Sequence, residues 1–278
     1  MSSKIDLHIH STSSDGIFNP KEILEKVRKK KIKYFSITDH DNIDSIKLIR
    51  KENLDKINYI SGVEISAYYD YYGIHILGYF IDGDTTRLES LLKKIKSNRK
   101  KRMQEILDTL KIKSDIEIKN DDLDDLMSSN NIGKKKLGSI LLKYNLGKDY
   151  IEVRDKFLTG MHCKTSYRES IIDVSDAIKE AGGIVILAHP KELEKRYGVK
   201  LEDEIEKLIS FGIDGIEIYH SIHTKDDIKR YYKIAKKYNL ITSGGSDFHG
   251  YPNSKISLGK ISKEKVFRYK KLNIIDRL

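Results

Sequence analysis

Short apolar runs of strand-like composition recur along the chain, and most of them are separated by segments of helical period. The runs cover residues 5–9, 34–38, 59–65, 74–80, 184–188, 213–219 and 240–243. Among the helical segments, Asn19 and Pro20 form a cap and first turn before an apolar stripe of Ile23, Leu24 and Val27. Alternation of this kind favours an α/β fold with a largely parallel sheet.

The middle of the chain has a different pattern. Residues from about 85 to 170 contain no strand-like run and show helical period. We therefore expect a discontinuous α/β domain formed by residues 1–84 and 171–278, with a helical insertion, or cap domain, at residues 85–170.

Composition excludes several classes of protein. The 278 residues are 38% hydrophobic and 34% charged, too apolar for a disordered chain, and no apolar run approaches the length of a membrane span. The N-terminal residues lack a secretory pattern, and a single cysteine, Cys163, cannot form an internal disulfide. We expect a cytoplasmic protein that does not contact membranes.

The net charge of +10 restricts the possible ligands less than the composition restricts the class of protein. Short basic runs at residues 28–31, 99–102 and 134–136 are accompanied by an acidic run at residues 121–125. Runs of this length are typical of solvated helix faces. The balance favours anionic ligands such as phosphates, but it does not by itself predict nucleic-acid binding.

Most histidines lie in the predicted strands or shortly after them. Of nine histidines, all but His162 lie within or just after the apolar runs. The carboxyl ends of strands form the ligand-binding rim in parallel α/β folds. Acidic residues share these positions, namely Asp6, Asp15, Asp39, Asp41, Glu64, Glu217 and Asp247. Imidazoles and carboxylates that converge on one rim predict a site for several divalent ions.

Local spacing supports this prediction. A period of two places Asp6, His8 and His10 on one strand face, so two imidazoles can chelate one ion. Asp6 is then placed to hold, by a hydrogen bond, the imidazole nitrogen that does not bind the ion. The same alternation points Asp247 and His249 together.

Each of these residues alone has a simpler interpretation. His75 or His189 taken singly is more often a hydrogen-bonded core histidine than a ligand, and Glu64 taken singly is a salt-bridged strand acid. The structural interpretation would, however, require eight histidines to collect by chance at predicted strand ends.

Seven segments resemble, in order, the motifs of the PHP (polymerase and histidinol phosphatase) superfamily. They read DLHIHSTSSDG, ITDHDNID, SGVEIS, IHILGYFID, GGIVILAHP, GIEIYHSIHT and GSDFHG. Together they are most similar to stand-alone metal-dependent phosphoesterases of the 3′,5′-nucleotide bisphosphate phosphatase branch, which carry a helical insertion. The resemblance implies a distorted (β/α)7 barrel that holds two or three divalent ions.

The resemblance also implies a ligand set. One ion takes His8, His10, Glu64 and Asp247; a second takes Asp15, His40 and His249; a third shares Glu64 and adds His75 and His189. Five of these are the expected catalytic group, namely Asp15, His40, Glu64, Asp247 and His249. Imidazole and carboxylate ligands without thiolate suit Mn, Fe or Zn. We hypothesise that a metal-bound hydroxide is the nucleophile.

Substrate contacts are expected outside the metal ligands. His223 occupies the position at which the family places a phosphate-contacting histidine, and His220 is a further contact or, as we favour, a surface histidine. Lys134 aligns with a phosphate-binding arginine of the family and keeps the charge but not the bidentate fork. A solvated lysine run at residues 134–136 is an equally good interpretation.

The predicted activity is hydrolysis of a phosphate ester of a small nucleotide, such as a 3′,5′-bisphosphonucleotide. Within the same resemblance, a 5′–3′ exonuclease on short 5′-phosphorylated RNA is a close alternative, and histidinol-phosphate phosphatase a more distant one. A non-catalytic metal-binding scaffold is the alternative from another class. No signature of long-duplex binding is present, and the oligomeric state stays open.

Overall fold

The computed structural model describes residues 4–130, 132–161, 168–252, 254–260 and 272–278. His162 and Cys163 lie outside the described residues. The chain divides into two compact units. Met1–Leu91 and Glu169–Leu278 form one, here called the α/β unit, and Leu92–Arg168 form the other, here called the helical unit.

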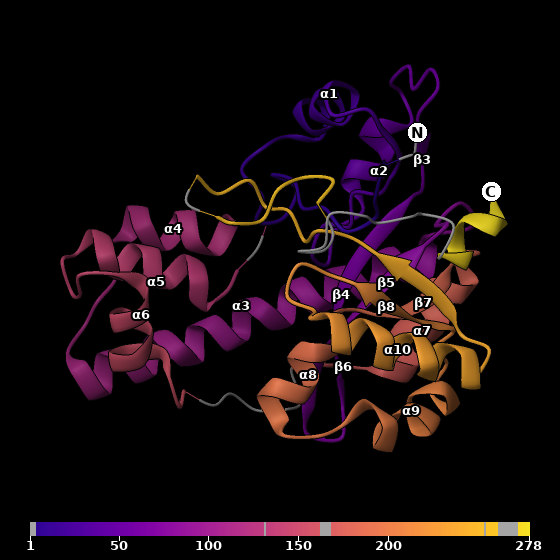
Figure 1. The fold of residues 1–278 in the computed structure, drawn as a ribbon. Helices are drawn as coiled ribbons and strands as arrows, with labels where there is room; N and C mark the ends of the chain where they lie inside the picture. Colours follow the sequence, from indigo (N-terminus) through magenta and orange to yellow (C-terminus); the bar gives the residue numbers. More distant parts are fainter. Residues whose placement is uncertain (1–3, 131, 162–167, 253, 261–271) are drawn as a thin grey trace. The chain divides into compact units, whose positions relative to one another are not determined.

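The α/β unit contains two sheets (Figure 1). A three-stranded parallel sheet has the order β1 (Lys4–Asp6), β2 (Ile32–Phe35) and β3 (Asn58–Tyr59). A six-stranded sheet has the order β6 (Glu169–Ser170), β4 (Gly62–Tyr69), β5 (Tyr72–Tyr79), β7 (Ile184–Leu187), β8 (Gly215–Tyr219) and β9 (Ile241–Gly244). Each predicted run overlaps a strand, and the run at residues 59–65 is divided between β3 and β4.

Backbone hydrogen bonds join the two sheets at both ends. Leu7 N donates to Gly244 O at 3.2 Å, beside β1 and β9. On the other side, Glu64 N donates to Asp39 O at 3.2 Å and Asp41 N donates to Glu64 O at 2.8 Å. The segment that follows β1 is thereby held against β9, and the segment that follows β2 is held against β4.

The six-stranded sheet is less parallel than predicted. β5 runs antiparallel to both β4 and β7, whereas β4–β6, β7–β8 and β8–β9 are parallel. The reason is local: β4 and β5 are joined by Asp70 and Tyr71, and Asp70 adopts a positive φ of 49°. A two-residue reversal of this kind makes a hairpin, and hairpin strands are antiparallel.

Helices cover the sheets of the α/β unit. α1 (Pro20–Lys29) begins at the predicted cap, where Asn19 and Glu22 form a capping box, and it buries the predicted apolar stripe. α7 (Ile171–Glu180) and α10 (Lys225–Lys237) pack against the six-stranded sheet (Figure 1). The remaining elements are α2 (Asp44–Ile49), α8 (Pro190–Tyr197), α9 (Leu201–Ser210) and the 3₁₀ turn η4 (Asn273–Arg277).

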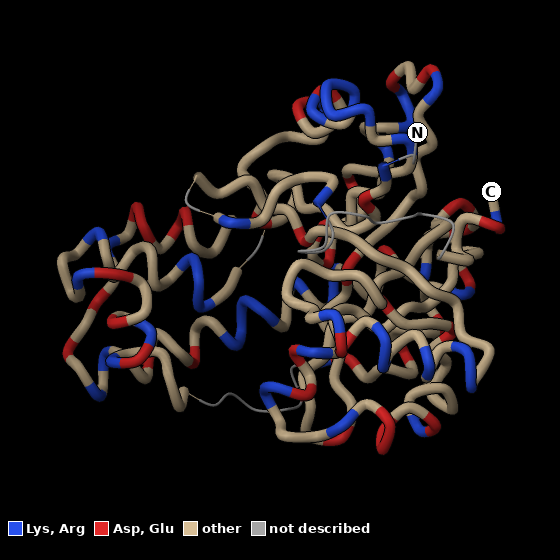
Figure 2. The backbone as a smooth tube through the Cα atoms, in the orientation of Figure 1, with Lys and Arg blue, Asp and Glu red and all other residues tan. Residues whose placement is uncertain are grey.

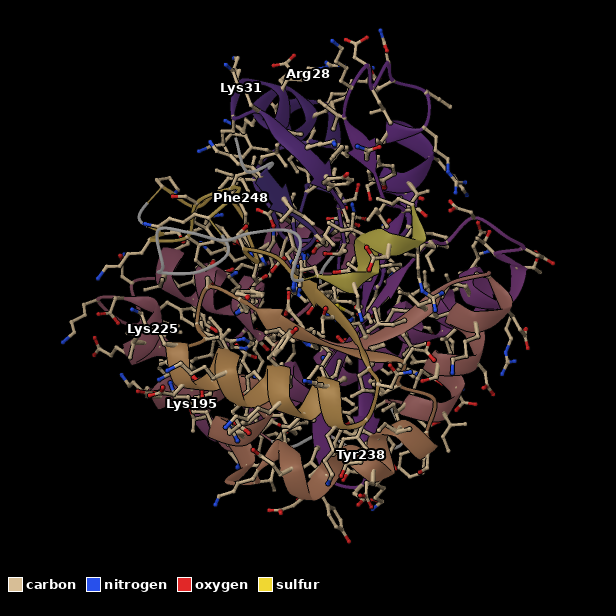
Figure 3. All side chains as sticks on the ribbon, turned by 45° about the vertical axis from the view of Figure 1, so that its right-hand side comes forward. Arg28, Lys31, Lys195, Lys225, Tyr238 and Phe248 are labelled. Atoms are coloured by element: carbon tan, nitrogen blue, oxygen red, sulfur yellow. The ribbon has the colours of Figure 1, made fainter. Side chains whose placement is uncertain are left out.

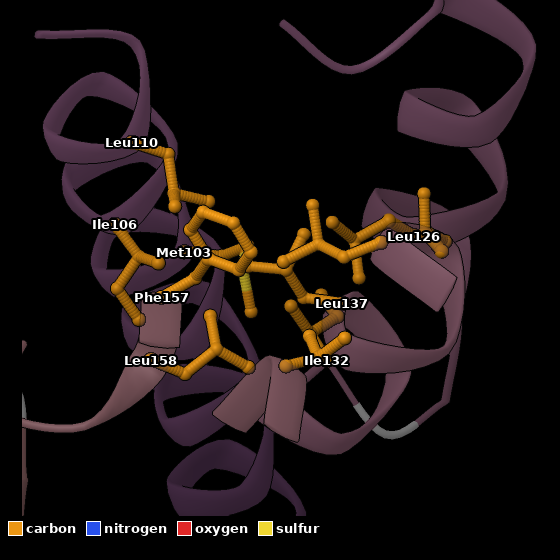
Figure 4. Packing of buried hydrophobic residues seen from close by; sticks show 11 residues of the cluster. Met103, Ile106, Leu110, Leu126, Ile132, Leu137, Phe157 and Leu158 are labelled. Carbon is orange, nitrogen blue, oxygen red and sulfur yellow. The ribbon is translucent and has the colours of Figure 1, made fainter. Parts of the chain in front are cut away.

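The helical unit takes most of α3 (Thr86–Ser114), which begins in the α/β unit. It also contains α4 (Asn120–Ser128), α5 (Lys134–Lys143), α6 (Tyr150–Val153) and the π-helical turn η1 (Arg154–Leu158). These elements share an apolar core that includes Met103, Leu110, Leu126, Leu137 and Phe157 (Figure 4). Helical period in this region therefore reflects packing of the unit around a core of its own.

Charged residues of both signs are interspersed along both units (Figure 2). In the helical unit, two residues of the acidic run pair with lysines of α5: Asp125 with Lys136 and Asp122 with Lys143, both at 2.7 Å. Within the described part of the chain, no helix is both long enough and apolar enough to cross a bilayer.

Substitution of Gly245 tests how closely the segment after β9 approaches the segment after β1. A Cβ at residue 245 would lie 2.2 Å from His8 Cβ and 2.3 Å from His8 N. We expect Gly245→Ala to lower the free energy of unfolding by about 3 kcal/mol, since backbone atoms cannot yield easily. Gly198→Ala is the control, because it meets open space and strains only a φ of +71°, which costs about 1 kcal/mol. If denaturant unfolding showed that the two variants lose the same free energy of unfolding, the close approach of residue 245 to His8 would be contradicted.

Candidate metal centre

The nine predicted ligand residues come from the ends of neighbouring strands. His8 and His10 follow β1, His40 follows β2, Glu64 and His75 lie in β4 and β5, and His189 follows β7. Asp247 and His249 follow β9, and Asp15 lies in the loop before α1. The structure brings all nine side chains into one cluster within the α/β unit.

Glu64 occupies the middle of this cluster. Its side chain is 1% exposed, and five imidazoles surround its two carboxylate oxygens. Oε1 lies 3.0 Å from His75 Nδ1 and 2.9 Å from His189 Nε2, whereas Oε2 lies 3.3 Å from His8 Nε2, 3.2 Å from His10 Nε2 and 3.0 Å from His40 Nδ1. One carboxylate thus joins histidines from four different strand regions.

Two further carboxylates complete the cluster. Asp247 Oδ1 lies 3.1 Å from His10 Nε2 and 3.6 Å from His8 Nε2. Asp15 Oδ1 lies 3.1 Å from His249 Nε2. Between Asp247 and His249 lies Phe248, which is labelled in Figure 3. Its ring packs against the apolar cluster under α1 and stacks on Phe18. This apolar anchor fixes the alternation that turns Asp247 and His249 toward the histidines.

Groups of ligand atoms close enough to share one ion occur at four places in the described residues. They are His10–Asp15–His40–His249, His8–Glu64–His189, His40–Glu64–His75 and His8–His220–Asp247. Asp15, His40 and His249 share a group, as the resemblance implies, but His10 joins them. His75 and His189 both contact Glu64, yet they fall into separate groups.

The chemistry of these atoms fits divalent cations. Several buried ligand atoms make no hydrogen bond within the described residues, among them His8 Nε2, His10 Nδ1, His10 Nε2, His40 Nδ1 and Glu64 Oε2. Buried polar atoms are otherwise nearly always satisfied, because desolvation without a partner is costly. Nitrogen and oxygen donors without thiolate suit Mn, Fe or Zn.

The electrostatics follow from burial and mutual contact. Burial alone raises the pKa of the Glu64 carboxyl, but the imidazoles of His40 and His8 outweigh it and hold that pKa well below its ordinary value. Burial alone lowers the pKa of His10, whereas the carboxylates of Asp247 and Glu64 raise it to about 10. A cation and the ring protons therefore compete for the same nitrogen lone pairs.

Glu217 lies outside the expected ligand set but accepts hydrogen bonds from two residues of that set. The sequence predicts that it lies among the acidic residues of the rim but indicates no role for it. Its buried carboxylate accepts from His8 Nδ1 at 3.0 Å and from the backbone N–H of His189 at 2.8 Å. His189 has a φ of +26°, which residues with a side chain rarely adopt. An isolated acid in the otherwise apolar strand β8 is the sequence signal for this role.

The prediction that Asp6 holds an imidazole is wrong. Its buried carboxylate accepts from Ser246 N at 2.8 Å, Ser246 Oγ at 2.6 Å and Gly259 N at 2.7 Å. The segment after β9 lies beside β1, so its donors occupy the carboxylate oxygens instead of a ring nitrogen. Burial raises the pKa of Asp6 to about 6, against the opposing effect of these hydrogen bonds.

The predicted substrate contacts have different surroundings. The interpretation of His220 as a surface histidine is wrong, because its side chain is 1% exposed. His223 is also buried, and its Nδ1 donates to Ile218 O at 2.8 Å. Lys134 donates to the carbonyls of Leu158 at 2.8 Å and Met161 at 2.9 Å, all within the helical unit, so it differs from an ordinary solvated lysine.

Comparisons with known proteins agree on one family. The PHP domain matches residues 6–239. The chain is 32% identical to a 5′-3′ exoribonuclease of Haemophilus influenzae, covering 94% of both chains. It is 29% identical to a phosphoribosyl 1,2-cyclic phosphate 1,2-diphosphodiesterase of Eggerthella lenta, covering 88% of this chain and 94% of the other. It is also 29% identical to a 3′,5′-nucleoside bisphosphate phosphatase of Chromobacterium violaceum, covering 88% and 87%.

A solved structure shows the same fold. An amidohydrolase from Chromobacterium violaceum, with bound sulfate and no metal, superimposes with a TM-score of 0.77 and 27% identity. The alignment covers 91% of this chain and 90% of that chain.

Glu217→Gln tests the support of the cluster. The amide keeps the shape but offers an N–H₂ group to one of two donors, so His8 or the His189 backbone loses its acceptor. We expect the affinity for Mn²⁺ to fall about 10- to 100-fold in calorimetric titrations. Glu206→Gln on the surface of α9 removes the same charge and should bind Mn²⁺ as the wild type does. Unchanged affinity in Glu217→Gln would show that the carboxylate does not orient the ligands.

Proposed function

The chain belongs to the PHP domain family, and from this premise we propose that it is a metal-dependent phosphoesterase, a hydrolase that acts on ester bonds. The observation that carries the proposal is the Glu64 carboxylate enclosed by five imidazoles, with buried ligand atoms that make no hydrogen bond to any described residue. Such a constellation is costly to bury without cations, and clustered cations suit phosphoryl transfer.

The proposed ligand sets are those that the family resemblance implies, for two or three ions of Mn, Fe or Zn. His8, His10, Glu64 and Asp247 hold one ion, Asp15, His40 and His249 a second, and Glu64, His75 and His189 a third. The close group that holds Asp15, His40 and His249 supports the second set. The contacts of His8 and His10 with both Glu64 and Asp247 support the first set, and the contacts of His75 and His189 with Glu64 Oε1 support the third.

The protein's own residues hold the ligand atoms in position and exclude water from the floor of the site. Divalent ions, when bound, draw charge from phosphoryl oxygens and lower the pKa of coordinated water. His8, His10 and Glu64 form a dry floor, at most 1% exposed. Asp247 and His75 are 24% and 28% exposed, and they mark the side from which a substrate reaches the floor. We infer that Asp15, His40, Glu64, Asp247 and His249 surround the reacting phosphate.

The wider architecture is proposed on the same basis. We propose that the two sheets close into a distorted (β/α)7 barrel, which the backbone bonds of Leu7 and Glu64 support. Residues 1–84 and 171–278 would form the metal-binding domain, and the inserted residues 85–170 would limit substrate length. The single cysteine fits a reducing compartment, and we propose the cytoplasm.

The proposed substrate is a phosphate ester of a small nucleotide, such as a 3′,5′-bisphosphonucleotide, with His223 and Lys134 as contacts. The similarity to a 3′,5′-nucleoside bisphosphate phosphatase supports this choice. A second candidate is 5′–3′ exonucleolytic hydrolysis of short 5′-phosphorylated RNA, which the 32% identity to an exoribonuclease favours.

Product analysis on the Mn-loaded protein distinguishes these activities. The protein is given 3′-phosphoadenosine 5′-phosphate and a short 5′-phosphorylated RNA in parallel. Inorganic phosphate from the first substrate alone supports the nucleotide phosphatase, and mononucleotides from the RNA support the exonuclease. We expect metal-dependent hydrolysis of at least one. A metal-loaded protein that is silent on both, and on a generic phosphoester, would contradict the proposal and favour a scaffold.

Asp247→Ala serves as the inactive reference. Loss of a direct ligand should lower kcat/KM by more than about 100-fold, beyond the effect of losing a group behind the ligands. Asp226→Ala removes a 93% exposed carboxylate from α10 and should leave the rate unchanged. Full activity in Asp247→Ala would overturn the assignment of this residue.

A further inference from the structure

His220 lies against the metal cluster without belonging to the expected ligand set. It follows β8 directly and is 1% exposed. Its ring centroid lies 5.7 Å from that of His8 and 5.3 Å from that of His189. Its Nε2 lies 3.6 Å from Asp247 Oδ2, beyond hydrogen-bond distance. By proximity alone, His8, His220 and Asp247 could share an ion.

A backbone hydrogen bond determines which ring nitrogen carries the proton. The N–H of Ile222 donates to His220 Nδ1 at 3.3 Å. A backbone N–H can only donate, so Nδ1 must offer its lone pair. A neutral imidazole carries one hydrogen, which then lies on Nε2. A metal ligand would need a lone pair on Nε2, and that nitrogen already holds its proton.

The neighbouring His223 has the opposite arrangement. Its Nδ1 faces the carbonyl of Ile218 at 2.8 Å, and a carbonyl can only accept. Nδ1 therefore carries the hydrogen, and the outer Nε2 of the neutral ring holds a lone pair. Burial lowers the pKa of His223 to about 4, which favours this neutral form.

Both outer nitrogens are buried, and neither makes a hydrogen bond within the described residues. The two rings are 5.4 Å apart. One turn of chain thus presents a ring N–H and a ring lone pair side by side. A buried N–H without an acceptor is rare in folded proteins and points to a ligand that supplies one.

We propose that His220 donates a hydrogen bond from Nε2 to an anionic phosphoryl oxygen of the substrate, next to Asp247, and that it is not a metal ligand. The inference rests on the proposed phosphoesterase function. It makes His220, and not His223, the residue of this turn that donates a hydrogen bond to the phosphate. His223 in its neutral form offers an acceptor and meets a different substrate atom, such as a hydroxyl.

Three variants test the assignment. His220→Asn removes the donor at the Nε2 position, and His220→Gln restores an amide N–H near it. Ile222→Ala is the matched control from the same turn, because the Ile222 side chain is exposed and its backbone N–H, which donates to His220 Nδ1, is kept. The readouts are the Mn content per chain and the affinity of the Mn-loaded protein for inorganic phosphate, measured by calorimetry.

We expect all three variants to keep the Mn content of the wild type. His220→Asn should weaken phosphate binding about 10- to 100-fold, as loss of a hydrogen bond to a charged group does. His220→Gln should recover part of this loss, and Ile222→Ala should bind as the wild type does.

Two results would overturn the inference. Loss of Mn from both folded His220 variants would make His220 a ligand, and wild-type phosphate affinity in His220→Asn would exclude the contact. Either result leaves the proposed function standing if the wild type hydrolyses a phosphoester. A wild type that neither binds phosphate nor hydrolyses an ester would instead overturn both proposals.

Discussion

The burial of one carboxylate is the constraint on which the site depends. Glu64 is 1% exposed, and a carboxylate at that depth is strongly destabilising unless opposite charges or cations compensate it. Here the compensation comes from histidines that follow β1, β2 and β7 and from His75 in β5. Because the partners arrive from separate strands, the strand ends must converge on Glu64 for the carboxylate to be tolerated.

Three other buried carboxylates hold that convergence in place, and each uses both oxygens on donors of neighbouring segments. Glu217 joins His8 to the backbone of His189, and Asp6 joins β1 to the segment after β9. Asp39 accepts from Ser11 N and Ser11 Oγ, both at 2.6 Å. These contacts fix backbone positions beside the ligands, which is how a site keeps its geometry before any ligand arrives.

The sequence predicted the strands and the clustering of histidines because both follow from local pattern: apolar runs mark strands, and strand ends in this fold meet at one edge. It did not predict the antiparallel β5. The two apolar runs on either side of the turn at Asp70 and Tyr71 have a pattern that suits a parallel strand as well as an antiparallel one. The partner of Asp6, the burial of His220 and the role of Glu217 depend on segments distant in sequence. Such pairings are set by register and packing, which one sequence does not display.

The most direct measurement is anomalous diffraction at the manganese edge from crystals of the wild-type protein equilibrated with Mn²⁺. We expect anomalous peaks at coordination distance from both oxygens of Glu64, one on the side of His8 and His10 and one on the side of His75 and His189. At saturating Mn²⁺, an absence of peaks around Glu64, or peaks only elsewhere on the protein, would contradict the claim that this buried carboxylate exists to hold cations.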